Sequence, residues 1–159
     1  MKRIIIVRHG EYNHFHKGLD ELGRQQIDGL GKSLKPIING ESVKIISSTA
    51  KRAKQSAQIL ADMFKVKFKG YKSLWSGPGS PRDKGVSPEE IVRIIQGIKS
   101  ENLIMVTHLE YSEELPQFIR GTILDGIGNG FPSHETEKGE AWVIDCEAKT
   151  CDLVRPKFK

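Results

Sequence analysis

Two histidines in this sequence each follow a short apolar run, and a histidine in that position can do chemistry. His9 follows segment 4–7 with only Arg8 between them, and His108 comes directly after segment 103–107. An imidazole held at the end of a buried strand can act as a nucleophile or as a general base. Gly10 lets the backbone turn sharply beside His9 and lets a ligand come close. Each histidine alone is equally compatible with a plain loop residue or a hydrogen-bonded core residue.

Two arginines accompany these histidines. Arg8 precedes His9, and Arg52 lies in segment 47–53, which follows another apolar run and opens a predicted helix. A helix N-terminus favours phosphate, and two guanidinium groups with the imidazole of His108 could surround a phosphoryl group on His9. The strand ends lack the acidic residues of a magnesium-dependent phosphoryl transferase, so we expect no metal and no other cofactor.

These side chains can meet only if several strands end at one edge of a sheet. The apolar patterns predict strands at 3–7, 43–46, 66–68, 103–107, 141–146 and 151–154. They predict helices from 19 to about Pro36, over 50–63 with Ser48 and Thr49 as N-cap candidates, over 87–99, and over 111–120. Segments 75–86 and 126–139 read as irregular loops. The alternation predicts one α/β domain over 1–159, a three-layer sandwich with helices on both faces of a mostly parallel sheet and an antiparallel C-terminal hairpin strand.

Composition fits an ordinary globular protein. The chain has 159 residues, of which 37% are hydrophobic and 28% charged. The formal net charge of +5 comes from scattered Lys and Arg residues, which favours a basic pocket over a nucleic-acid surface. We expect a cytoplasmic protein with no membrane partner, because no apolar run has membrane-spanning length and the N-terminus does not resemble a signal peptide. Cys146 and Cys151 are too few for a disulfide framework, and we expect thiols that could face each other across a hairpin.

Four motifs, in order and in approximate spacing, resemble the histidine phosphatase superfamily, which is phosphoglycerate mutase-like in fold. They are Arg8-His9-Gly10-Glu11, the segment from Leu19 through Gly23 to Gln26, the Ser-Ser-x-x-x-Arg-Ala of residues 47–53, and Val106-Thr107-His108. The resemblance extends from residue 3 to about residue 145. Small size and Leu109 after His108 are most similar to the short branch of phosphohistidine phosphatases. The Arg-His-Gly-Glu-Tyr start and Leu74-x-x-Gly77 also resemble a protein-phosphatase branch related to the mutases.

The resemblance implies a metal-independent phosphatase that works through a phosphohistidine. His9 would be the nucleophile, Arg8 and Arg52 would bind phosphoryl oxygens, and His108 would help to hold the transferring group beside the backbone of Leu109. Elementary chemistry agrees, because phosphoryl transfer needs positioned cations around the equatorial oxygens. His9 must be neutral to attack, so its other ring nitrogen needs a partner such as the Gly10 carbonyl.

The proton donor is where the sequence departs from the family. Members that cleave ordinary phosphate esters carry a glutamate near the position occupied here by Ser76. Asp83, Glu11 and Glu110 are the remaining candidates, and Asp83 comes first because its glycine-rich loop could fold over the site. Asn13 is out of register with the family's asparagine and stands as an outside candidate for a phosphate ligand. Because an alkoxide needs protonation more than an imidazole or aryl oxide does, we expect phosphohistidine or aryl phosphates to be preferred over sugar phosphates.

Two smaller features leave alternatives open. His14 and His16 form a His-x-His pair that could bind a metal ion, but no third ligand has suitable spacing, so a surface or substrate loop is favoured. Trp75 and Phe131 lie in the irregular loops and could either line the pocket or pack elsewhere.

The expected partner is a phosphorylated small molecule or a phosphoprotein. A phosphoglycerate mutase-like phosphotransferase is the main alternative, although the chain has little room for a cap. An inactive phosphate-binding or scaffold relative is a different class, and a nucleic-acid-binding domain has only the net charge in its favour. The sequence leaves the oligomeric state, the pathway and the physiological substrate open.

Overall fold

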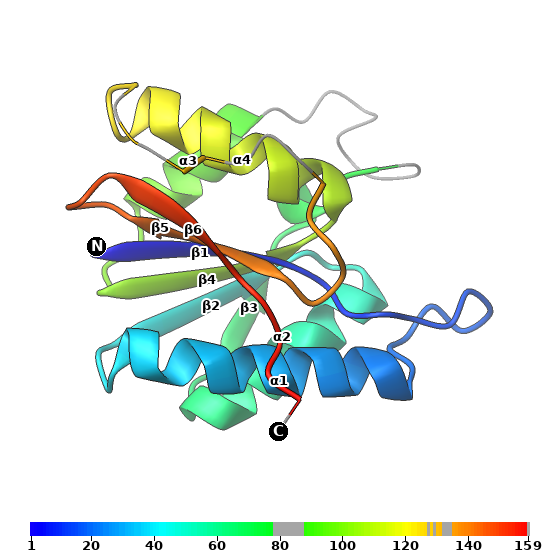
Figure 1. Ribbon diagram of the computed structural model, residues 1–159. Helices are drawn as coiled ribbons and strands as arrows, with labels where there is room; N and C mark the ends of the chain where they lie inside the picture. The colour runs from blue at the N-terminus through cyan, green and yellow to red at the C-terminus, as the bar shows by residue number, and fades with distance from the viewer. Residues whose placement is uncertain (78–87, 127, 129, 132–134, 159) are drawn as a thin grey trace.

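A single mixed sheet forms the centre of the computed structural model, which describes residues 1–77, 88–126, 128, 130–131 and 135–158. Within these residues the sheet has six strands in the order β3-β2-β4-β1-β5-β6 (Figure 1). Their bounds are β1 Arg3–Arg8, β2 Val43–Ser47, β3 Phe68–Gly70, β4 Asn102–Thr107, β5 Ala141–Asp145 and β6 Thr150–Val154. The helices are α1 Glu21–Ile38, α2 Lys51–Phe64, the short 3-10 helix η1 Lys72–Leu74, α3 Pro88–Gln96 and α4 Leu109–Thr122.

Helices cover both faces of the sheet. Figure 1 shows α1 and α2 on one face and α3 and α4 on the other. Strand β1 contributes side chains to the cores on both faces of the sheet. Ile5 and Val7 pack in the core under α1 and α2. Ile4 and Ile6 pack in the core under α3 and α4. This alternation is the period of two expected of a strand, here with both faces apolar. The predicted three-layer sandwich is confirmed.

Strand direction brings the functional segments together. Strands β1, β2, β3 and β4 pair in parallel, and β5 runs antiparallel to β1, followed by β6 antiparallel to β5. Arg8 lies opposite Thr107 at the carboxyl ends of β1 and β4, and Ser47 of β2 lies opposite Val106. The residues that follow β1, β2 and β4 therefore start at one edge of the sheet, where open α/β sheets place their ligand crevices.

Several predicted boundaries are wrong. Helix α1 begins after its N-cap Asp20, whose carboxylate accepts a hydrogen bond from the Gly23 N–H at 2.7 Å, and it continues through Pro36. A proline so close to the C-terminal end costs only one backbone donor, so it does not end the helix. Strand β3 lies two residues later than expected. Helix α4 starts directly after His108 and includes Pro116.

The N-cap prediction for α2 is also wrong. Ala50 is the N-cap and makes no side-chain capping bond. Ser48 instead turns its hydroxyl toward the site, where it also accepts from the Ala50 N–H at 3.2 Å. Helix α3 starts at Pro88, one residue after the start of the predicted range 87–99, and Ser87 itself lies outside the described residues.

The two cysteines lie at the C-terminal hairpin, and both are free. Cys151 pairs in register with Ile144, so Cys146 lies beyond the ladder and does not face it as expected. Burial raises the pKa of Cys151 to about 12. A thiol with so high a pKa is poorly nucleophilic at neutral pH.

Candidate active site

His9 lies at the carboxyl end of β1, with its ring fixed by a backbone carbonyl. Its Nδ1 is 2.8 Å from the Gly10 carbonyl oxygen, and its Nε2 is 3.2 Å from Nε of Arg52. Because a guanidinium group can only donate, Nε2 accepts and Nδ1 carries the proton. Burial lowers the pKa of His9 from 6.5 to about 3, and the charges of Arg52 and Arg8 act in the same direction. The imidazole is therefore neutral at physiological pH, with its lone pair on Nε2.

The turn after His9 requires glycine. A Cβ on Gly10 would lie 2.6 Å from the backbone oxygen of Gly23 in α1, and a Cβ on Gly23 would overlap the backbone of Glu11. The backbone N–H of Glu11 also donates to Oε1 of Gln26 at 2.8 Å. Gly23 and Gln26, which are part of the family-like pattern, therefore hold the loop after β1 against the first turns of α1.

Arg52 joins the two histidines. It extends from the first turn of α2, and its Nη2 donates to Nδ1 of His108 at 3.2 Å. Because His108 Nδ1 accepts, its Nε2 carries the proton and donates to Oγ of Ser48 at 2.8 Å. Burial lowers the pKa of His108 to about 2, so this ring is neutral as well. The centroids of the His9 and His108 rings are 5.1 Å apart.

Arg8 approaches the same space from β1. Its Nη1 donates to the carbonyl oxygen of Thr136 at 2.6 Å and lies 3.9 Å from a carboxylate oxygen of Glu135, an exposed side chain. Its Nε is buried and has no hydrogen-bond partner among the described residues. A buried donor without a partner is costly, so this nitrogen is available to an anion that enters the site.

A cavity of about 220 Å³ opens between these side chains. It is lined by Arg8, His9, Tyr12, Arg52, Ser76, Gly77, His108, Leu109, Glu110 and Lys138. The ring of Tyr12 lies between two cations, 4.7 Å from the Arg52 guanidinium carbon and 5.4 Å from Lys138 Nζ. The surplus of positive charge and the two imidazoles suit an anionic group with several oxygens, such as a phosphoryl group.

The structure brings together Arg8, His9, Arg52, His108 and Leu109, as the sequence predicts, and of the other candidates it adds only Glu110 among the described residues. Glu11 is not among the residues that line the cavity, and its carboxylate forms an ion pair with Lys138 at 2.7 Å. Asn13 is turned into its own loop, where Oδ1 accepts from the backbone N–H of Phe15 at 2.8 Å. Asp83 lies outside the described residues. Glu110, the third acid candidate, lines the cavity.

The remaining candidate side chains take supporting positions. Trp75 stacks on His108 with centroids 6.0 Å apart, so it backs the site without lining it. Phe131 packs against the core under α3 and α4. His14 is exposed, and Nδ1 of His16 accepts from the backbone N–H of Gly18 at 3.0 Å. In the described part of the chain, no group of three His, Cys, Asp or Glu side chains is arranged to hold a metal ion.

The sequence does not identify Tyr12, Thr136 or Lys138 as part of the site, and it does not identify Ser48 as the partner of His108. Tyr12 directly follows the Arg-His-Gly-Glu motif, and this position is the local feature that could have indicated its place. Lys138 and Thr136 arrive from a segment more than 120 positions away, which the backbone N–H of Gly139 ties to the carbonyls of Arg8 and His9 at 3.1 and 3.2 Å. No helix among the described residues is both long and apolar enough to span a membrane.

Comparisons with known proteins agree with this geometry. The model of the histidine phosphatase superfamily (branch 1) matches residues 4–74, which include Arg8, His9 and Arg52. No curated protein matches the chain significantly. Among solved structures, one assigned as the phosphohistidine phosphatase SixA from Agrobacterium tumefaciens has 18% identity and a TM-score of 0.67, with 98% of each chain covered.

Two further structures are similar. A mycobacterial glucosyl-3-phosphoglycerate phosphatase has 15% identity and a TM-score of 0.66, with 100% of both chains covered. The alpha-ribazole phosphatase from Shigella flexneri has 17% identity and a TM-score of 0.62, over 98% of this chain and 96% of that chain. At these identities the likeness establishes the fold, and each substrate named belongs to the neighbour.

Proposed function

The chain belongs to the histidine phosphatase superfamily, with the family match over residues 4–74 and the family's fold, and from this premise we propose that it is a metal-independent phosphatase. The nucleophile is Nε2 of His9. The observation that carries the proposal is the orientation of this ring, whose protonated Nδ1 is bound to the Gly10 carbonyl while Nε2 meets Arg52 at the cavity.

Hydrolysis proceeds in two displacements. The incoming phosphoryl group accepts the N–H groups of Arg52, which releases the lone pair of His9 Nε2 to attack phosphorus. The N–P bond forms as the bond from phosphorus to the leaving group breaks. Water then attacks the phosphohistidine, the N–P bond breaks, and inorganic phosphate leaves while His9 returns to its neutral form.

The cations act on the transition state. Arg8 and Arg52, with His108 fixed by Ser48, bind the equatorial oxygens on which charge is spread. These groups are held in place before the substrate arrives, so little reorganisation is needed during the reaction. The charge supplied elsewhere by a metal ion comes here from the two guanidinium groups.

The substrate is a phosphorylated small molecule or a phosphohistidine protein. The named substrates of the structural neighbours include both classes, which supports this range without selecting within it. The preference for phosphohistidine and aryl phosphates that Ser76 suggests holds only if no other carboxyl group protonates the leaving group.

The test is hydrolysis of 4-nitrophenyl phosphate by the pure protein. We expect turnover in the presence of a chelator, inhibition by vanadate, and no turnover by His9→Ala. Phosphate binding without turnover would instead identify an inactive relative, and transfer to an added alcohol in preference to water would identify a phosphotransferase. Full activity of His9→Ala would refute the mechanism.

A further inference from the structure

A phosphatase that cleaves an alkyl ester needs an acid beside the leaving group, because an alkoxide is a very poor leaving group without a proton. Ser76 lines the cavity but has only a hydroxyl group, which is too weak an acid for this task. The question is which carboxyl group of the described chain lies where the leaving oxygen must be.

Glu110 is the one carboxyl side chain lining the cavity in the described part of the chain. It lies in the first turn of α4, two residues after His108. The other carboxyl groups nearby are engaged elsewhere. Glu11 is paired with Lys138, and Glu135 is exposed and lies 3.9 Å from Nη1 of Arg8.

Ser76 holds the Glu110 carboxylate in place. Its Oγ donates to Oε2 of Glu110 at 2.9 Å and accepts from the backbone N–H of Tyr111 at 3.3 Å. One oxygen of the Glu110 carboxylate is thus held by Ser76, which lies near the position where ester-cleaving members of the family carry a glutamate. The carboxyl group reaches this place from α4 instead of from the segment after η1.

The other carboxylate oxygen of Glu110, Oε1, faces a glycine. Gly77 has a φ of 97° and lines the cavity, and a Cβ at that position would lie only 3.0 Å from Oε1 of Glu110. No described residue forms an ion pair with Glu110. Since Ser76 holds Oε2 and no described residue donates a hydrogen bond to Oε1, Oε1 is the oxygen that can exchange a proton with a group bound in the cavity.

We propose that Glu110, positioned by Ser76, is the proton donor of this site, and that the site therefore cleaves phosphate monoesters of aliphatic alcohols. This inference rests on the proposed phosphatase function. In the first step the proton of Glu110 passes to the ester oxygen as its bond to phosphorus breaks and the N–P bond to His9 forms. In the second step the Glu110 carboxylate takes a proton from the attacking water, which restores the starting state.

The test compares two substrates that differ in their need for an acid. Glu110→Gln keeps the size and the hydrogen bond to Ser76 but cannot donate the proton. We expect its kcat/KM for glycerol 2-phosphate to fall about 100-fold, the lower range for loss of a general acid. Its kcat/KM for 4-nitrophenyl phosphate, whose leaving group needs no proton, should stay within about fivefold of wild type.

Two further variants complete the design. Glu113→Gln, in the same helix and outside the cavity lining, should behave as wild type on both substrates. Ser76→Ala should lower the glycerol 2-phosphate rate alone, by about tenfold, because it releases the carboxylate from its anchor. Because this variant removes only one hydroxyl group, it still tests the role of Glu110 if Glu110→Gln folds poorly.

The outcomes separate the two claims. An unchanged ratio of the two kcat/KM values in Glu110→Gln, with wild type active, would overturn the role of Glu110 alone. Failure of wild type to cleave glycerol 2-phosphate while it forms a phosphoenzyme from 4-nitrophenyl phosphate would also overturn it alone. Absence of a phosphoenzyme in wild type would overturn the proposed function itself.

Discussion

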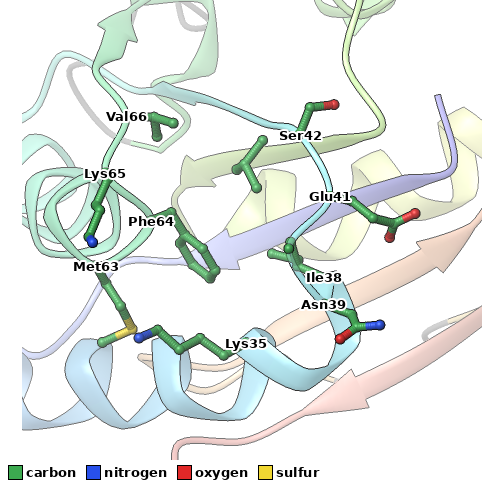
Figure 2. A pocket seen from close by; sticks show the side chains of 11 residues that line it. Lys35, Ile38, Asn39, Glu41, Ser42, Met63, Phe64, Lys65 and Val66 are labelled. Atoms are coloured by element: carbon green, nitrogen blue, oxygen red, sulfur yellow. The ribbon is translucent and has the colours of Figure 1, made fainter.

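Two cavities lie at opposite edges of the sheet, and they differ in volume, in the residues that line them and in the direction of the helices beside them. The cavity at His9 has a volume of about 220 Å³, and the one at the other edge has about 440 Å³. Figure 2 shows the larger cavity, where the last turn of α2, with Met63 and Phe64, faces the last turn of α1, with Lys35 and Ile38. It lies at the amino ends of β2 and β3.

Chain direction explains the difference. Helices α2 and α4 begin at the smaller cavity, so their backbone N–H groups point toward it and favour an anion. Helices α1 and α2 end at the larger cavity, each in a left-handed residue, Asn39 and Lys65. Its carboxylate, Glu41, is already paired with Lys2 and with Arg3. Volume alone would favour the larger cavity, whereas strand direction and the Nε of Arg8, unpaired among the described residues, favour the cavity at His9 as the proposed site.

Removing one cation at each edge should produce the largest contrast. We expect Arg52→Ala to lower kcat for 4-nitrophenyl phosphate about 100- to 1000-fold, the range for loss of one donor to a developing anion. Lys65→Ala, at the larger cavity, should leave kcat within about twofold of wild type. Equal losses in the two variants, measured by steady-state kinetics, would remove the distinction between the edges.

The two buried histidines of the smaller cavity predict a dependence of stability on pH. His9 and His108 have folded pKa values of about 3 and about 2 against an ordinary value of 6.5. Below pH 6.5 the unfolded chain binds protons on these rings that the folded protein excludes, so stability is lost as the pH falls. Each histidine contributes a slope of up to about 1.4 kcal/mol per pH unit.

Denaturant unfolding between pH 4 and pH 6.5 measures this slope. Other acidic groups add to it, so the decisive quantity is the difference between variants. His108→Gln should lower the slope by up to about 1.4 kcal/mol per pH unit, even if it is less stable throughout. An identical slope in wild type and His108→Gln would mean that this imidazole is not held neutral.

A truncation at the larger cavity should have the smallest effect. Met63→Ala removes the packing of this α2 side chain against Gly31 of α1, at a cost of about 1 to 2 kcal/mol in the free energy of unfolding. Turnover should change less than twofold, and the pH slope of stability should match wild type. A large loss of kcat in a variant that remains folded would connect this cavity to the chemistry.

The strand ends were predictable because their signals are local. An apolar β-branched run that ends in Arg8-His9-Gly10, and another that ends in His108, predict buried strands, and parallel strands bring their carboxyl ends to one edge. The same reasoning placed Arg52 in the first turn of α2 and the Gly10 carbonyl on His9. Local pattern therefore predicted the centre of the candidate site.

Long-range packing could not be predicted in this way. Lys138 reaches the cavity because Gly139 binds the carbonyls at the end of β1, and no sequence period encodes that contact. Glu11 pairs with Lys138 and is not part of the cavity lining, and Glu110 is held by Ser76, which comes from another segment. The sequence pattern predicts a helix end near Pro36, because it does not show the packing of Ile38 with which α1 continues.

The most direct test of the account is to identify the covalent intermediate. The protein would be mixed with 4-nitrophenyl phosphate for milliseconds, quenched in alkali to preserve phosphohistidine, digested, and examined by mass spectrometry. We predict one phosphoryl group on the peptide that contains His9, formed as the first 4-nitrophenolate is released and absent from His9→Ala. Turnover in wild type with no phosphoryl group on His9, or with one on His108, would contradict the account.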